Sequence, residues 1–167
     1  MTISLIALLT GAGALIYAVG IALYILKKNT GNEKMQAIAQ SIREGANAYL
    51  NRQTATIAVF TVVIAVLLYI FIPEGEYSNN VIATAGFVIG AIFSLAAGYI
   101  GMSVSVRANV RTAEAAKKGL KPALDIAFKG GLVTGMIVVG LSLIGVSGLY
   151  LILNKFFDIP VTSVPQL

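Results

Sequence analysis

Four long stretches of this 167-residue chain carry no charged side chain, and this pattern limits what the chain can fold into. The stretches cover residues 1–26, 53–73, 77–106 and 130–154. A helix needs about 20 apolar residues to cross the hydrocarbon core of a bilayer, so each stretch is long enough to span a membrane. Backbone N–H and C=O groups in lipid must be hydrogen-bonded within their own segment, so we expect each stretch to be helical.

The composition excludes a free soluble domain. Hydrophobic side chains make up 57% of the chain and charged ones only 11%, with a mean hydropathy of +0.87. A soluble domain carries about 25% charged residues, which it needs to keep its surface in water. The chain has no Cys and no His, which excludes disulfides, thiolate metal sites and the commonest catalytic base.

These features predict the fold class. We expect an all-α membrane protein with four antiparallel transmembrane helices, which form a single unit over residues 1–167. The predicted spans are residues 2–26, 54–73, 80–106 and 130–153. Two basic segments, residues 27–53 and 107–129, connect the first span to the second and the third to the fourth.

The distribution of positive charge predicts the orientation. Eleven of the twelve Lys and Arg residues lie in the two basic segments, whereas the turn at 73–80 has none and carries Glu74 and Glu76. Under the positive-inside rule both basic segments face the cytoplasm, so the N-terminus and the C-terminus lie outside. A signal peptide over residues 1–26 is less favoured, because no basic residue precedes the apolar run and Lys27 and Lys28 follow it. The basic residues that we single out are Arg43, Arg52, Arg107, Arg111, Lys117, Lys118, Lys121 and Lys129.

Both basic segments have helical patterns. From Glu33, apolar residues recur at steps of three or four, which predicts an amphipathic helix that continues into the second span. In the second segment, Gly119 interrupts the pattern and Pro122 suits the first turn of a new helix. The cations there could form a patch for an anion or phosphate, or they could only fix the topology at the membrane surface. Spacing alone favours the second interpretation.

Small residues recur every four positions in the third span and are frequent in the fourth. Such rows let helix backbones approach closely, which is how membrane helices pack when lipid removes the hydrophobic drive. We therefore predict that they contact each other or helices outside this chain. The predicted packing residues are Gly86, Gly90, Ser94, Gly98, Gly101, Gly131, Gly135 and Gly140.

The residues themselves indicate no active site. No ionisable side chain lies in the predicted spans, although such groups usually mark ion and proton paths. The seven acidic residues are dispersed, so no carboxylate cluster is suited to Mg²⁺. The glycines after Lys129 have a spacing like that of a P-loop, but Met136 replaces its lysine. We assign no catalytic, cofactor-binding or metal-binding residue, and we expect no nucleic acid partner despite the net charge of +5.

Four segments nevertheless resemble one family, the membrane-integral pyrophosphatases. Residues 41–53 (SIREGANAYLNRQ) are similar to the stretch that enters the family's second helix. Residues 98–102 (GYIGM) and 107–113 (RANVRTA) resemble the end of its third helix, and residues 127–141 resemble its fourth. The similarity runs in order along nearly the whole chain and includes charged and glycine positions.

The resemblance implies a pump that couples hydrolysis of cytoplasmic pyrophosphate to outward transport of H⁺ or Na⁺. Such pumps are homodimeric, multi-pass proteins of the cell membrane that need Mg²⁺ and, in one subclass, respond to K⁺. Their catalytic motifs begin at the fifth helix, and helices one to four belong to an outer ring. The resemblance therefore implies a structural segment that binds no cofactor itself, is inactive alone, and has the bilayer, the remaining helices and a second subunit as partners. Pyrophosphate is a ligand of the full-length protein only.

Two origins fit this sequence. It can be an N-terminal fragment of the pump or a four-helix protein derived from it. The alternative function is a non-enzymatic four-span membrane protein whose basic segments bind anionic lipid or a partner protein. A channel or carrier is disfavoured, because the spans lack ionisable groups.

Overall fold

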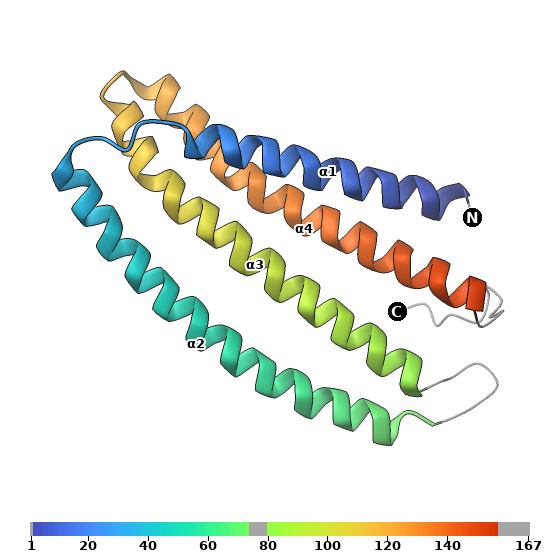
Figure 1. Ribbon diagram of the computed structural model, residues 1–167. Helices are drawn as coiled ribbons and strands as arrows, with labels where there is room; N and C mark the ends of the chain where they lie inside the picture. Colours follow the sequence, from blue (N-terminus) through green and yellow to red (C-terminus); the bar gives the residue numbers. More distant parts are fainter. Residues whose placement is uncertain (1, 74–79, 157–167) are drawn as a thin grey trace.

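The computed structural model describes residues 2–73 and 80–156, and these fold into four long helices (Figure 1). They are α1 (Thr2–Leu26), α2 (Glu33–Phe71), α3 (Asn80–Ala116) and α4 (Leu120–Phe156). All four are long and apolar enough to cross a membrane, which confirms the predicted all-helical, four-span fold class. The predicted outside location of the two termini stays a prediction, and the C-terminal residues 157–167 lie outside the described part of the chain.

The helices begin and end where local chemistry requires it. Asn32 caps α2, because its side-chain oxygen accepts a hydrogen bond of 3.0 Å from the Met35 amide. Gly31 before it has a φ of +77°, and Gly119 between α3 and α4 has a φ of +120°. Both values lie in the left-handed region that favours glycine, so these residues separate one helix from the next. Pro122 lies in the first turn of α4, as the sequence predicted.

The basic segments are helical extensions of the spans rather than separate loops. α2 runs without a break from Glu33 to Phe71, so the predicted amphipathic helix does continue into the second span. Its 39 residues correspond to a length of about 58 Å, far more than the roughly 30 Å of the hydrocarbon core. α3 likewise continues past the predicted end of its span at residue 106 to Ala116. The helices therefore project beyond the bilayer at one end.

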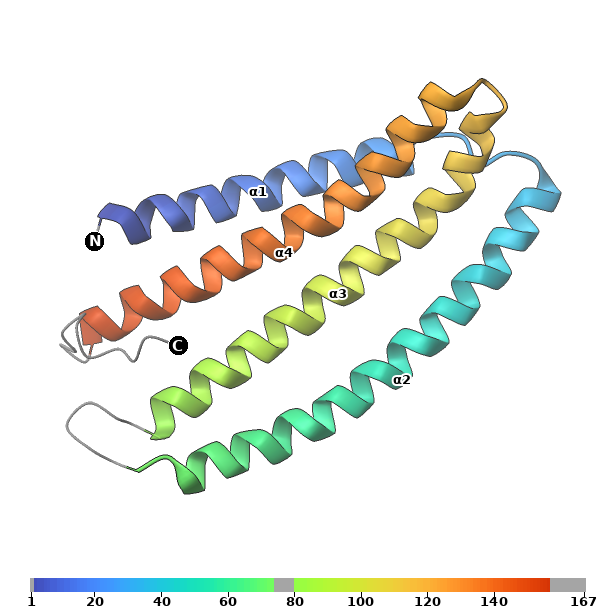
Figure 2. The ribbon, with the colours of Figure 1, turned by 180° about the vertical axis from the view of Figure 1, so that it is seen from behind.

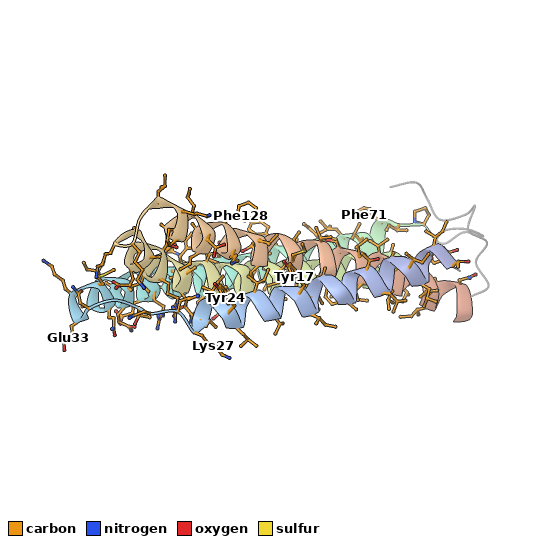
Figure 3. The ribbon with its side chains drawn as sticks, turned by 90° about the horizontal axis from the view of Figure 1, so that it is seen from above. Tyr17, Tyr24, Lys27, Glu33, Phe71 and Phe128 are labelled. Atoms are coloured by element: carbon orange, nitrogen blue, oxygen red, sulfur yellow. The ribbon has the colours of Figure 1, made fainter. Side chains whose placement is uncertain are left out.

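The four helices lie side by side in one curved layer, in the order α1, α4, α3, α2 (Figures 1 and 2). Each helix runs antiparallel to its neighbour, and a view along the layer shows how thin it is (Figure 3). The largest fully buried side chains are Ile25 on α1 and Val133 on α4. The buried core cluster combines residues of α1, α3 and α4 and includes none from α2. The fold is thus an open wall of helices with two broad faces.

Close backbone contacts hold α4 against its two neighbours. A Cβ atom on Gly11 would lie only 2.9 Å from the carbonyl oxygen of Gly140, so α1 and α4 meet where both residues are glycine. A Cβ on Gly101 would lie 2.7 Å from Thr134 Cγ2, which marks a second close approach, between α3 and α4. Gly86 also faces α4, with Leu149 Cδ2 3.1 Å from the corresponding position. Three of the predicted packing residues therefore lie at contacts between helices of this chain.

The other predicted packing glycines have no neighbour of this kind. A Cβ on any of them would meet no atom within 4 Å among the described residues. Two of them line an apolar cleft of about 460 Å³ between α3 and α4, to which Ser94 also contributes. Gly86 and Gly101 of α3 thus meet Leu149 and Thr134 of α4 rather than its glycines, and Gly140 of α4 faces α1. Contact with helices outside this chain stays a prediction for Gly90, Gly98, Gly131 and Gly135.

The contact between Gly11 and Gly140 can be tested with a matched pair of substitutions on α1. We expect Gly11→Ala to lower the free energy of unfolding in detergent by about 1–3 kcal/mol, because the new methyl group meets a backbone oxygen that cannot move aside. Gly13→Ala, two residues away, meets no atom within 4 Å and should be neutral or slightly stabilising. Thermal unfolding followed by circular dichroism measures both effects. Equal midpoints for the two variants would contradict this contact.

Candidate functional site at the basic end of the helices

The charged side chains of the described residues gather at one end of the layer, which we call the basic end. It comprises the end of α1, the start of α2, the end of α3 and the start of α4 (Figure 1). In Figure 3, Lys27 and Glu33 lie toward this end and Phe71 lies toward the other. Seven of the eight basic residues singled out from the sequence belong to it: Arg43 on the first part of α2, Arg107, Arg111 and Lys117 near the end of α3, and Lys118, Lys121 and Lys129 around the start of α4. Arg52 lies at the middle of α2.

Arg111 ties α3 to the end of α1. Its Nη2 donates a hydrogen bond of 2.8 Å to the carbonyl oxygen of Leu26, the last residue of α1. Its Nη1 donates a second bond of 2.6 Å to the carbonyl of Arg107 in the preceding turn. Arg111 is only 9% exposed, which is unusual for a charged residue. A cation at the C-terminus of a helix interacts favourably with the helix dipole, so this contact stabilises the end of α1.

Two further arginines surround Arg111, which lies beyond the uncharged run that ends at Val106. Burial is the main cause that lowers the pKa of Arg111, and the nearby positive charges of Arg43 and Arg107 lower it further. The guanidinium group still stays charged, because arginine is not deprotonated in proteins. No carboxylate among the described residues forms an ion pair with any of the three. The Nε atoms of Arg43 and Arg111 are buried and have no hydrogen-bond partner among the described residues.

Two acids of this end pair with lysines instead. Glu114 Oε2 lies 2.5 Å from Lys117 Nζ, and Asp125 Oδ2 lies 2.7 Å from Lys129 Nζ. Both pairs join residues three or four positions apart, at the end of α3 and within α4, so they stabilise these surfaces by a modest amount. The ring of Tyr24 is approached by two ammonium groups, of Lys28 at 4.2 Å and of Lys129 at 4.5 Å from its centroid. Tyr24 thereby connects the end of α1 to the start of α4.

Two small cavities open at this end. One, of about 190 Å³, lies between α3 and α4 and is lined by Ser105, Asn109 and Thr112 together with small residues of α4. The other, of about 220 Å³, lies between α1, α3 and α4 and includes Lys28, Arg111 and Lys118 in its lining. No group of three or more acidic, His or Cys residues that could hold a metal ion occurs within residues 2–73 and 80–156. The described residues of this end carry more positive than negative charge.

Comparison with known proteins decides the family. Residues 12–166 match the family described as inorganic H⁺ pyrophosphatase. The chain belongs to this family. It is 51% identical over 144 residues to a K⁺-insensitive pyrophosphate-energized proton pump of Methanosarcina mazei, and the match covers 86% of the chain and 21% of that relative.

Two further relatives illustrate the range of the family. A K⁺-insensitive pyrophosphate-energized proton pump 2 of Moorella thermoacetica is 46% identical over 140 residues, which cover 84% of the chain and 20% of the relative. A putative K⁺-stimulated pyrophosphate-energized sodium pump of Clostridium tetani is 45% identical over 128 residues, with coverages of 77% and 18%. The chain thus spans about a fifth of the length of the curated relatives that it matches.

Sequence analysis of this pyrophosphatase-family chain missed three features of the structure. Gly11 is not among the predicted packing residues, yet a Cβ atom there would lie only 2.9 Å from the carbonyl oxygen of Gly140 on α4. Tyr24 had no signal except its position one turn before two lysines. The burial of Arg111 could not be predicted either, because it depends on α1 lying close to α3 at this end. All three depend on which helices are neighbours, which periodicity does not reveal.

The hydrogen bond of Arg111 to Leu26 predicts a local effect at the end of α1. We expect Arg111→Gln to speed hydrogen exchange of the Lys27 and Lys28 amides about tenfold or more, because the end of α1 loses a bond to a charged donor. Exchange measured by mass spectrometry on the protein in detergent resolves this segment. Arg52→Gln is the matched control, because it removes the same charge from an exposed position. Unchanged exchange in Arg111→Gln would show that the bond does not hold this helix end.

Proposed function

We propose that this chain forms the outer-ring wall of a membrane pyrophosphatase that couples pyrophosphate hydrolysis to transport of H⁺ or Na⁺. The observation that supports this most is the open layer: four long apolar helices lie side by side, and the described part of α2 buries only Leu50. A membrane protein that stood alone would gain more by closing its helices around a common core. An open layer instead suits a wall that is covered by further helices on one face and by lipid on the other.

The catalytic chemistry of the pump belongs elsewhere under this proposal. The relatives are named as pyrophosphate-energized pumps, and this chain corresponds to about a fifth of their length. Pyrophosphatases of this family are expected to need Mg²⁺, but the described residues do not fit such a site, because Glu114 and Asp125 are each paired with a lysine and no group of three or more acidic residues occurs among them. We therefore place the Mg²⁺ and K⁺ sites and the pyrophosphate ligands on segments other than the one described.

The apolar cleft between α3 and α4 indicates how the wall contacts the rest of the pump. Gly90 and Gly98 present bare backbone to this cleft, and Ile89, Phe93 and Leu141 supply its apolar sides. Close approach of a further helix would fill the cleft and exclude lipid from the glycines. In a homodimer, the second subunit would cover another part of the layer.

A complementation experiment tests the proposed function. The chain is produced in membranes alone and together with the part of the Methanosarcina mazei pump that lies beyond the matched segment. We expect no pyrophosphate hydrolysis from the chain alone and restored hydrolysis and ion transport from the pair. Hydrolysis by the chain alone, or a pair that is well expressed but neither associates nor hydrolyses pyrophosphate, would contradict the proposal.

The cleft yields a sharper prediction within that experiment. Gly90→Leu should leave the thermal midpoint of the chain alone unchanged, because nothing lies within 4 Å of this position. It should lower complementation at least about tenfold, because a leucine side chain in the cleft keeps a second helix away. Gly135→Leu, at a position on α4 that does not line the cleft but also has no atom within 4 Å, is expected to have the same effect. Wild-type complementation by both variants would show that these glycines do not contact the rest of the pump.

The proposed orientation can be tested because the chain contains no Cys. A reporter Cys at Thr30 should be shielded from a membrane-impermeant thiol reagent added outside, since the positive-inside rule places the basic end in the cytoplasm. A Cys at Ser78 should be labelled by the same reagent. Permeabilised cells, in which both sites react, provide the control. The reverse labelling pattern would overturn the proposed orientation.

A further inference from the structure

The cavity between α1, α3 and α4 at the basic end has the features of a phosphate-binding pocket. Its volume of about 220 Å³ corresponds to roughly seven waters at about 30 Å³ each, which is enough for a phosphate group and part of its hydration shell. It lies against the first two turns of α4 through Pro122, Asp125 and Ile126, and the positive end of the helix dipole there favours an anion. The charged and aromatic residues of its lining are Tyr24, Lys28, Arg111, Glu114, Lys118 and Asp125.

The two acidic residues of this lining are already neutralised. Glu114 is paired with Lys117 and Asp125 with Lys129, and neither lysine belongs to the lining of the cavity. The negative charge of the pocket is therefore compensated from outside it. What remains inside is an excess of positive charge.

The three cations of the lining have no anionic partner among the described residues. Both Nη atoms of Arg111 donate hydrogen bonds to backbone carbonyls, and its Nε is buried without a partner among the described residues. Lys28 is held over the ring of Tyr24, a contact that orients the ammonium group but leaves its charge uncompensated. Lys118 is exposed. Because an unpaired buried guanidinium is costly, an anion that enters this pocket gains more than one that meets exposed lysines.

We propose that the pocket binds the phosphate group of an anionic phospholipid. The depth of the pocket identifies the lipid as the source of the phosphate. The uncharged run of α1 ends at Leu26, and the lining residues Tyr24 and Lys28 lie on either side of that end. Tyrosine is enriched where the hydrocarbon core meets the headgroups, and basic pockets between membrane helices at this level bind lipid headgroups. The inference needs only that the four helices span a bilayer, so it stands apart from the proposed pump function.

Native mass spectrometry of the chain in neutral detergent tests this site with phosphatidylglycerol as the probe and phosphatidylcholine as the zwitterionic reference. We expect one tightly retained phosphatidylglycerol and no comparable retention of phosphatidylcholine. The double variant Lys28→Gln/Lys118→Gln should weaken retention of phosphatidylglycerol about thirtyfold, since each lysine near an anionic headgroup contributes about a factor of five. The control Lys34→Gln/Lys121→Gln removes two charges from the same end but outside the cavity lining, and it should retain the lipid.

The outcomes separate the possibilities. Equal loss in the two double variants would show a diffuse attraction of charge, and it would overturn the site. Displacement of phosphatidylglycerol by millimolar pyrophosphate would show that the pocket takes soluble phosphates, and it would overturn the lipid source. Lys118→Glu is a second variant, at an exposed position, that keeps the test valid if the double variant unfolds. It should also lose the lipid while keeping the helical circular dichroism signal, and wild-type retention would contradict the proposal.

Discussion

The contacts of α4 with both α1 and α3 hold this fold together. In lipid, burial of apolar side chains between helices gains little over contact with acyl chains, so packing depends on how closely the backbones can approach. The described structure achieves this closeness at a few points. Gly11 meets Gly140 between α1 and α4, and Gly101 meets Thr134 between α3 and α4. The two fully buried large side chains, Ile25 and Val133, come from α1 and α4.

The same constraint explains which parts of the structure could be predicted. The number and length of the helices follow from where charge is absent, and the continuous helix from Glu33 and the position of Pro122 follow from periodicity and helix chemistry. The order of the helices across the layer does not follow from these patterns. Small residues at four-residue spacing occur on several faces, and only the neighbouring helix decides which of them make contact. For this reason Gly101 meets Thr134 while Gly98, one turn away, faces open space.

The candidate site, too, could be predicted from the sequence only in part. Its basic character is visible in the sequence, because the basic segments hold most of the cations of the chain. The sequence does not reveal that Glu114 and Asp125 pair with lysines three or four positions away, or that no carboxylate among the described residues pairs with Arg111. Basic residues that only fix the membrane topology would stay exposed to water. The burial of Arg111 therefore requires a further explanation. Its hydrogen bond to Leu26 explains this burial in part, because it satisfies a backbone carbonyl at the end of α1.

The two edges of the helix layer are exposed. α1 and α2 are the two outer helices, and α2 contacts only α3 closely, so each has one flank without a neighbour among the described residues. Along the membrane-spanning part of α2, large apolar side chains such as Phe60, Val62 and Tyr69 are exposed. An isolated layer would leave lipid to cover both edges and both faces. A ring of helices would remove the edges by joining α1 and α2 to further helices. The open edges, rather than any single residue, are therefore the strongest physical argument that this chain works as part of a larger wall.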